Sequence, residues 1–319
     1  MPAILVIKHS ALGDILLASG CFKAIREHHR DDQIVLLTTQ PFVELARKSG
    51  YFDMVVVDRR PKLWHFGLWN QLLRLLRGFQ FTRVYDLHRK QRTRLLYRLL
   101  RWGRPDLEWS GVVPGCSHYQ PDPRDDFRHI VDKLTEQLAV AGLDRVPAPD
   151  LAWLTGNGLA ARAPQPFVLM VPGAAASRPE KKAPATLYGT LAQYLVSQGI
   201  TPVLVGAGSD AASLATVAAA CPRAINLCDQ TSLGDIADLA RLALGAVGND
   251  TGPMHLISLA GCPTVTLFSH ASDPRLVGPR GPAATVLRRE DLAELTVDEL
   301  IDALSAVWRR TEPAAQELA

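Results

Sequence analysis

Three loops of this 319-residue chain combine small residues with groups that can bind anions or move protons. The strongest candidate for anion binding is Gly248–His255 (GNDTGPMH), which follows an apolar run and opens a helical pattern. The free N–H groups and partial positive charge of a helix N-terminus suit a diphosphate. Gly252 lets a ligand approach the backbone, Thr251 adds a hydroxyl donor, and His255 lies one turn further on. The structural alternative is that Asp250 or Thr251 caps the helix and His255 is packed inside.

A second loop follows the first apolar run of the chain and contains a carboxylate. Its sequence, Lys8–Asp14 (KHSALGD), places several polar groups where a strand ends and a helix begins. A carboxylate at this position can act as a general base if a bound hydroxyl comes within hydrogen-bond reach. Asp14 is therefore a candidate base, and helix capping by the same side chain is the structural alternative.

The third loop, Val171–Pro184, is rich in small residues and carries Lys181 and Lys182, which can supply positive charge to a phosphate. It is not a P-loop, because GxxxxGK[ST] is absent. In a further loop, Asp210 follows the glycines of Gly206–Gly208 at the end of an apolar run. A carboxylate there can hold ribose hydroxyls, although the full GxGxxG of dinucleotide folds is missing.

These loops lie within two series of alternating strand and helix patterns, where each loop connects a strand to the following helix. The predicted strands are Ala3–Lys8, Ile34–Thr39, Met54–Asp58, Val84–Leu87, Phe167–Val171, Pro202–Val205, Ala224–Leu227, Gly245–Gly248 and Thr264–Phe268. The predicted helices are Asp14–His29, Pro41–Ser49, Phe66–Arg77, Lys90–Arg101, Pro184–Ser197, Ser209–Ala220, Ser232–Leu242 and Gly252–Ala260. Such alternation predicts the α/β class, with parallel sheets covered on both faces. The prolines and glycines of 146–166 separate the series, and we place the boundary between residues 155 and 156.

Composition favours a globular protein over disorder or a membrane span. Hydrophobic residues make up 47% and charged residues 21% of the chain. No apolar run reaches the roughly 18 to 20 residues of a membrane span, and the N-terminal run is broken by Lys8 and Asp14, so we expect no signal peptide. The five cysteines form no CxxC pair, which argues against a disulfide framework or a zinc site. The sequence therefore predicts a cytoplasmic protein without a disulfide framework or a zinc site.

Positive charge is concentrated in the first half of the chain. Residues 1–150 contain 23 Lys and Arg against 17 Asp and Glu, whereas residues 151–319 contain 12 against 15. The excess is densest in Arg83–Arg104. Such a segment attracts nucleic acid, anionic lipid or a phosphorylated glycan, unless it is simply the solvated face of a helix.

Together these segments resemble glycosyltransferase family 9, the ADP-heptose:lipopolysaccharide heptosyltransferases. The matching parts are Ser10–Leu16 (SALGDIL), Pro172–Pro184, Gly248–Phe268 and Ser272–Gly281, in the order of the family. The resemblance implies the GT-B architecture, with two Rossmann-like doubly wound domains facing a central cleft. Residues 1–155 would hold the acceptor and residues 156–319 the nucleotide sugar. It also implies inverting transfer without a metal or cofactor, and a last helix that can cross back to the first domain.

The resemblance also implies roles for individual residues. Asp14 matches the base that deprotonates the acceptor hydroxyl. The donor residues are Lys181, Asp210, Asp250, Thr251, Gly252 and His255. The residues assigned to the acceptor are Lys8, Ser10, Arg59 and Arg60. Two departures leave the donor sugar open: Ala183 stands where the family has Trp, and Ser269–Ala271 replaces a GPT sequence.

The implied partners are a nucleotide sugar, expected to be ADP-heptose, and an anionic glycolipid, the Kdo/heptose inner core of lipopolysaccharide. This acceptor predicts peripheral contact with the cytoplasmic face of the inner membrane, where the apolar and basic segment Leu63–Phe81 can lie. No nucleic acid is expected, because no binding motif is recognisable. The alternatives are a family member that uses another sugar or glycan acceptor, a nucleotide- or nucleic-acid-binding protein, and an NAD-dependent hydride-transfer enzyme.

Overall fold

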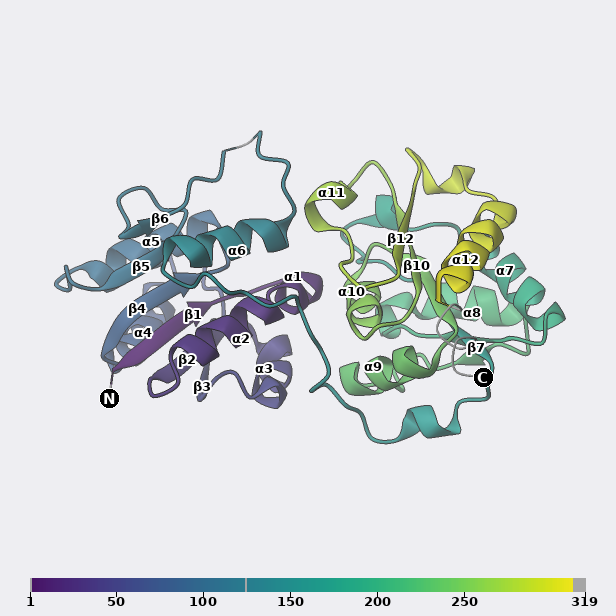
Figure 1. The fold of residues 1–319 in the computed structure, drawn as a ribbon, viewed down its shortest axis with the longest axis horizontal. Helices are drawn as coiled ribbons and strands as arrows, with labels where there is room; N and C mark the ends of the chain where they lie inside the picture. The colour runs from purple at the N-terminus through teal and green to yellow at the C-terminus, as the bar shows by residue number, and fades with distance from the viewer. Residues whose placement is uncertain (1, 124, 312–319) are drawn as a thin grey trace. The chain divides into compact units, whose positions relative to one another are not determined.

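The computed structural model describes residues 2–123 and 125–311, and it divides the chain into two compact units. The first unit extends to Pro149 and the second begins at Asp150, six residues before the boundary predicted from the sequence. Figure 1 shows that each unit has a central sheet with helices on both faces.

The first unit contains a six-stranded parallel sheet with the strand order β3-β2-β1-β4-β5-β6. Its strands are β1 (Ala3–Ile7), β2 (Gln33–Thr38), β3 (Met54–Val57), β4 (Phe81–Asp86), β5 (Glu108–Gly111) and β6 (His118–Tyr119). Its helices are α1 (Leu12–Leu17), α2 (Ser19–His28), α3 (Val43–Ser49), α4 (Phe66–Arg77), α5 (Gln91–Arg101) and α6 (Ile130–Val140). The order 3-2-1-4-5-6 is that of the Rossmann fold.

Alternate residues of the first strand pack against different helices. Ala3, Leu5 and Ile7 share a buried cluster with residues of α4 and α5, such as Leu72 and Leu96. In Figure 1, α4 and α5 lie behind the sheet, and α2 and α6 lie in front of it. Every residue of β1 is buried, which explains its continuous apolar sequence, because a central parallel strand is covered on both faces.

The second unit repeats this topology. Its strands are β7 (Phe167–Val171), β8 (Thr201–Leu204), β9 (Ile225–Asn226), β10 (Gly245–Asn249), β11 (Thr264–Phe268) and β12 (Ala284–Arg288), in the order β9-β8-β7-β10-β11-β12. All of these neighbours are parallel. Its helices are α7 (Ala185–Ser197), α8 (Ala211–Ala220), α9 (Leu233–Leu242), α10 (Gly252–Leu259), α11 (Pro274–Val277) and α12 (Val297–Thr311). Counted from β7, this is again the order 3-2-1-4-5-6.

The last helix packs on the core of its own unit. Leu300, Leu304 and Val307 of α12 are buried in one cluster with residues of α7 and α8. The extension of this helix across to the first unit stays a prediction, and residues 312–319 lie outside the described part of the chain.

Most predicted elements are present. The fold class is as expected, with two doubly wound α/β units. The expected helix over Asp14–His29 is divided at Ala18, whose ψ of 0° interrupts the helix between α1 and α2. The sequence did not indicate β5, β6, β12 or α6. The strand β6 has only two residues, which is too short for an alternating pattern to be recognised.

Within the described residues, no helix is long and apolar enough to span a membrane.

Close packing at Gly20 gives a test of the first unit. A β-carbon at Gly20 in α2 would lie 2.1 Å from the carbonyl oxygen of Pro147. Because the neighbour is backbone, we expect Gly20→Ala to lower the free energy of unfolding by about 1–3 kcal/mol. Gly67→Ala in α4 is the matched control, since a β-carbon there meets nothing within 4 Å. Urea denaturation of both variants measures the difference, and equal stability would contradict the packing described here.

Candidate active site

The strand order determines where each unit can bind a ligand. In an open parallel sheet, ligands bind beyond the carboxyl ends of the strands, at the point where the strand order reverses. This point lies between β1 and β4 in the first unit and between β7 and β10 in the second. The loops that sequence analysis singled out follow three of these strands: Lys8–Asp14 follows β1, Val171–Pro184 follows β7, and Gly248–His255 follows β10.

Asp250 is the centre of a polar cluster after β10. Its Oδ2 accepts hydrogen bonds from Lys181 Nζ at 2.5 Å and from Ser272 Oγ at 2.7 Å. Its Oδ1 lies 3.6 Å from Nε2 of His255. Burial by itself would raise the pKa of Asp250, but the hydrogen bonds from His255, Lys181 and Ser272 outweigh burial and lower this pKa to about 2. Asp250 is therefore a carboxylate at neutral pH and holds the Lys181 ammonium beside the loop after β10.

Asn249, the last residue of β10, fixes the loop after β7. Its side-chain oxygen accepts hydrogen bonds from the Ala183 amide and the Tyr188 hydroxyl, at 3.1 and 3.0 Å. Its side-chain nitrogen donates to the carbonyl oxygens of Pro172 and Gly173, both at 3.0 Å. Asn249 thus joins both ends of the loop that contains Lys181, and Ala183 occupies a fully buried position.

The N-terminus of α10 has unused hydrogen-bonding capacity. Thr251 precedes the helix and Gly252 is its first residue, and the Thr251 side chain does not cap the helix. Thr251 Oγ1 and His255 Nδ1 are buried and have no hydrogen-bond partner among the described residues. A buried polar group without a partner costs about 1–3 kcal/mol. A bound anion would satisfy the Thr251 hydroxyl and the free N–H groups of the first helical turn together.

Asp210 lies at the same edge of the second sheet. A β-carbon built on Gly173 would lie 2.2 Å from the carboxyl carbon of Asp210, so this carboxylate lies directly against the loop after β7. Asp210 Oδ2 also accepts a hydrogen bond from the Ala207 amide at 3.2 Å. The structure therefore brings the predicted donor residues from three loops to one edge of the sheet.

In the first unit, Asp14 lies in the first turn of α1. Its Oδ2 accepts a hydrogen bond from the Ala11 amide at 2.8 Å. This contact caps the helix, which is the structural role that the sequence left open for Asp14. Its side chain is only half-buried, so the carboxylate keeps accessible lone pairs. Ser10, in the preceding loop, is half-buried as well. Capping and proton transfer by Asp14 are thus compatible.

Lys8 has a different environment from the one expected for an acceptor-binding residue. It is 3% exposed, and its Nζ donates to the carbonyl oxygen of Leu87 at 3.0 Å. Burial lowers the pKa of Lys8, while the nearby carboxylates of Asp14 and Asp86 oppose this effect. In the structure Lys8 joins the loops after β1 and β4, and its contact with an acceptor stays a prediction.

A buried cluster that sequence analysis missed joins β1, β3 and α5. Asp58 receives two hydrogen bonds from Arg92, at 2.8 and 2.9 Å, and its Oδ2 lies 3.2 Å from Nε2 of His9. Burial raises the pKa of Asp58, but the hydrogen bonds from His9 and Arg92 hold it well below its usual range. Asp58 Oδ1 also accepts from the Arg60 amide at 2.7 Å. The predicted acceptor residues Arg59 and Arg60 follow as exposed side chains.

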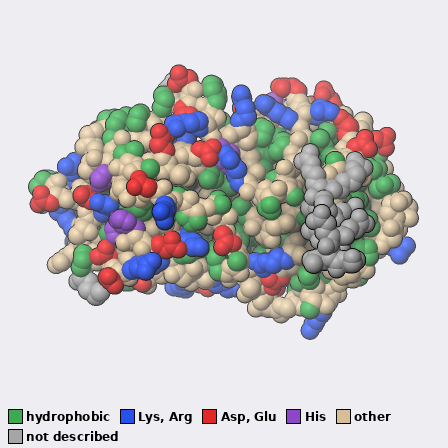
Figure 2. Space-filling model, in the orientation of Figure 1, with side chains coloured by type: hydrophobic (Ala, Val, Ile, Leu, Met, Phe, Trp, Pro, Cys, Tyr) green, Lys and Arg blue, Asp and Glu red, His purple; other side chains and the backbone are tan. Residues whose placement is uncertain are grey.

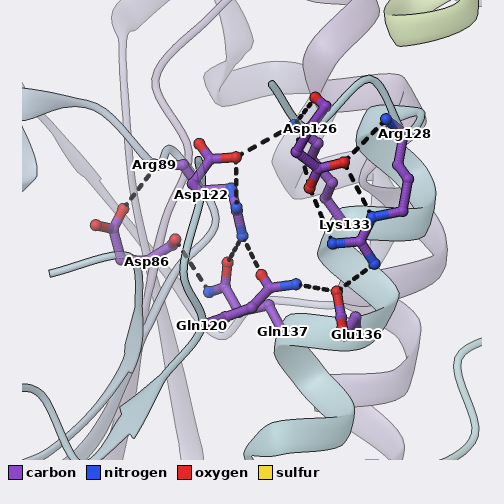
Figure 3. Close-up of polar contacts among 9 residues, drawn as sticks. All are labelled: Asp86, Arg89, Gln120, Asp122, Asp126, Arg128, Lys133, Glu136 and Gln137. Carbon is purple, nitrogen blue, oxygen red and sulfur yellow. Dashed lines mark hydrogen bonds and ion pairs between the residues drawn. The ribbon is translucent and has the colours of Figure 1, made fainter. Parts of the chain in front are cut away.

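A second missed cluster lies after β4 and is shown in Figure 3. The buried guanidinium of Arg89 donates to Gln120 and Gln137 and lies 3.1 Å from Asp122 Oδ1. Lys133 of α6 also pairs with Asp122, at 3.2 Å. Arg89 therefore ties the chain after β6 and the helix α6 to the carboxyl end of β4.

The basic segment Arg83–Arg104 does not form a single surface. Arg83 pairs with Glu108 at 2.5 Å, Arg89 and Arg92 are bound as described above, and Arg104 donates to the Phe81 carbonyl oxygen at 2.8 Å. Figure 2 shows the face opposite α4 and α5, and on that face Lys and Arg are interspersed with Asp and Glu. Sequence alone could not separate paired from unpaired arginines, because their partners are distant in the chain.

Some missed residues carried a signal in the sequence. Asn249 and Ser272 belong to the segments that carry the family resemblance, and Asp58 follows a predicted strand, the position where ligand-binding residues are expected. His270 and Arg275, in the chain after β11, contact other residues of the second unit. His270 Nδ1 lies 2.9 Å from the Glu290 carbonyl oxygen, and Arg275 pairs with Asp273 at 2.6 Å.

Two doubly wound Rossmann-like units in one chain are the architecture of GT-B glycosyltransferases. The model of glycosyltransferase family 9 (heptosyltransferase) matches residues 119–300, more than half of the chain. The chain belongs to this family, which confirms the resemblance seen in the sequence.

A curated relative agrees with this assignment. The lipooligosaccharide heptosyltransferase 2 of Haemophilus influenzae is 30% identical over 129 residues, which are 39% of this chain and 37% of that relative. The chain thus aligns with little more than a third of the curated relative.

Solved structures show the same fold over nearly the whole chain. The ADP-heptose lipopolysaccharide heptosyltransferase II of Escherichia coli matches with a TM-score of 0.78 at 19% identity, over 97% of this chain and 99% of that one. A family 9 glycosyltransferase of Veillonella parvula matches with a TM-score of 0.80 at 19% identity, over 97% of both chains. The E. coli heptosyltransferase WaaC with ADP matches with a TM-score of 0.73 at 17% identity, over 96% and 99%.

The depressed pKa of Asp250 predicts a stability difference in acid. A carboxyl group whose pKa is lowered by folding stabilises the protein above its unfolded pKa, and this contribution is lost as the pH falls through the folded value. We expect the advantage of the wild type over Asp250→Asn to shrink by about 2 kcal/mol between pH 5 and pH 2. Urea denaturation at both pH values measures it. Asp298→Asn, at an exposed position, is the control, and a constant advantage would argue against the ion pair.

Proposed function

We propose that this protein transfers heptose from ADP-heptose to the inner core of lipopolysaccharide. The observation that carries the proposal is the cluster after β10, where Lys181 is held by Asp250 beside the unpartnered Thr251 hydroxyl. Family membership supports the reaction class, and the names of the similar proteins supply the donor and acceptor.

The second unit is proposed to bind the donor. The N–H groups at Thr251 and Gly252 and the positive end of α10 would bind the diphosphate, and the Lys181 ammonium, held by Asp250, would add further hydrogen-bond donors. Asp210 would accept hydrogen bonds from the ribose hydroxyls of the donor. When the glycosidic bond breaks, negative charge develops on the departing ADP, and these donors stabilise it. Because Lys181 and the helix supply positive charge, we propose that the transfer is independent of a metal.

The first unit is proposed to bind the acceptor and supply the base. The acceptor oxygen attacks the anomeric carbon from the face opposite ADP, so a new C–O bond forms as the bond to the diphosphate breaks. The hydroxyl proton passes to the Asp14 carboxylate, and the anomeric configuration is inverted. General base catalysis of this kind contributes typically 10²–10⁴-fold. Ser10, Arg59 and Arg60, and through a rearrangement Lys8, are the proposed acceptor contacts.

The proposed acceptor is an anionic glycolipid with its lipid part in a membrane. We therefore propose that the protein acts in the cytoplasm and contacts the inner-membrane surface during turnover. The positive excess of residues 1–150 supports this partner, since anionic lipids attract basic surfaces.

The first test removes the proposed general base at Asp14 but keeps the hydrogen bond that caps α1. Asp14→Asn retains an oxygen that can accept from the Ala11 amide, but it cannot take the proton. We expect kcat to fall at least about a hundredfold with ADP affinity unchanged. ADP release from ADP-heptose with a Kdo-containing acceptor measures turnover. Asp31→Asn, an exposed aspartate of the same unit, is the control, and normal turnover of Asp14→Asn would remove Asp14 from this role.

The second test addresses the donor site. Lys181→Met removes the ammonium that Asp250 positions, whereas Lys182→Met removes an exposed neighbouring charge. A charge-assisted hydrogen bond contributes about 1.5–3 kcal/mol, so we expect ADP to bind the first variant at least about tenfold more weakly. Calorimetric titration with ADP measures both variants. Equal affinity in the two would contradict a diphosphate site at Lys181.

A further inference from the structure

Two grooves lie on either side of α4 in the first unit. The groove between α4 and α5, the basic groove, has a volume of about 690 Å³ and is lined by Arg60, Lys62, Arg94 and Arg98 together with Trp69. The groove between β3 and α4, the apolar groove, has a volume of about 360 Å³. Its lining includes Val56, Leu68, Leu72, Leu75 and Phe79. Pro61 lines both grooves, so they are neighbours separated by α4 and the loop before it.

The charges of the basic groove are not neutralised within the unit. Most arginines of the segment 83–104 are bound to carboxylates or carbonyl oxygens, as described above. In contrast, the side chains of Arg60, Lys62, Arg94 and Arg98 form no ion pair in the described part of the chain. Lys62 lies over the Trp64 ring, 5.1 Å from its centroid. The groove therefore offers positive charge to a ligand from outside the unit.

Large apolar side chains are exposed next to this charge. Leu63, Trp64 and Phe66, in the loop before α4 and its first turn, are 67%, 64% and 77% exposed. Further along α4, Leu68 and Leu75, which line the apolar groove, are 37% and 54% exposed. Exposed apolar patches of this kind mark interaction sites, because they are costly to leave in water. Here the patch and the unpaired cations belong to the same loop and helix.

We infer that α4 and the loop before it form the surface by which this protein docks on an anionic lipid bilayer. Lipid phosphates would occupy the basic groove, Trp64 and Phe66 would enter the interface, and an acyl chain would lie in the apolar groove. Basic residues beside Trp, Phe and Leu are the composition of interfacial helices, and anionic lipids attract each Lys or Arg near the surface. The inference deepens the proposed function by naming the lipid-binding surface, and it rests on that function only for the identity of the acceptor.

A bilayer fits these observations better than a protein partner. Phosphates and acyl chains are adjacent in a bilayer, just as the cationic and apolar linings are adjacent around α4. Arg60 also belongs to this surface, and its amide is bound to Asp58, which contacts His9 at the end of β1. The docking surface is thus linked to the loop that leads to Asp14.

The test measures binding of the full chain to vesicles of phosphatidylcholine, with and without 30 mol% (about a third) phosphatidylglycerol, by co-sedimentation. We expect clear preference for the anionic vesicles, with binding weakened by salt. Trp64→Ser combined with Phe66→Ser should reduce binding at least about fivefold. Arg94→Gln combined with Arg98→Gln removes two of the four unpaired cations and should lower the preference for anionic lipid about tenfold. Brominated acyl chains should quench the fluorescence of wild-type Trp64, measured as the difference from Trp64→Ser.

Matched controls are available in the same unit. Trp102→Ser removes a 78% exposed tryptophan outside this surface, and Arg30→Gln combined with Lys48→Gln removes two exposed charges elsewhere. Both controls should bind vesicles like the wild type. Equal loss in controls and test variants, or no binding by the wild type, would overturn the inference. So would a lower oligomeric state of the test variants than of the wild type, or binding of glycerol phosphate without binding of vesicles.

Failure of the docking surface can be distinguished from failure of the proposed function. On a soluble, deacylated acceptor, the four test substitutions should leave turnover unchanged, because none is in the proposed catalytic or donor site. Normal turnover without vesicle binding would overturn the docking surface alone. Vesicle binding that the test variants lose, in a protein without transferase activity, would leave the docking surface standing and refute the proposed function.

Discussion

The reversal of strand order in each sheet is the constraint on which both candidate sites depend. After the first three strands of a unit, the chain returns to the other side of the first strand, so the loops after β1 and β4, or after β7 and β10, diverge. The carboxyl edge at this point is open to a ligand, whereas the remaining backbone polar groups of the central strands are paired within the sheet. The same constraint acts in both units, although their side chains at this edge differ in charge and burial.

The second unit uses its crossover to hold polar groups in fixed positions without satisfying all of them. Asn249 fixes the loop after β7, and Asp250 holds the Lys181 ammonium, but the Thr251 hydroxyl stays unpartnered. A site assembled before its ligand arrives loses little free energy to reorganisation on binding. The unit therefore has a rigid frame around a small number of unsatisfied donors, which is the arrangement that an anionic ligand requires.

The first unit divides its cations between structure and surface. Arg83, Arg89 and Arg92 are bound to carboxylates at distances of 2.5 to 3.1 Å and connect elements far apart in the chain. The cations that line the basic groove form no ion pair among the described residues, and they lie near the exposed Trp64 and Phe66. The cations of this unit thus fall into two groups. Some connect elements of the fold through a carboxylate from another element, and the others have no such carboxylate within reach.

Local pattern was enough to predict the two α/β series, most helices and strands, and the loops that carry Asp14, Lys181 and Asp250, because periodicity and strand-end position are properties of adjacent residues. The GT-B class and the family followed from motifs of the same local kind. The sequence did not reveal the inward turn of Lys8, the Asp58 and Arg89 clusters, or the separation of paired from free arginines. Those depend on contacts between residues up to 79 positions apart, and such contacts exist only once the strands have adopted their order in the sheet.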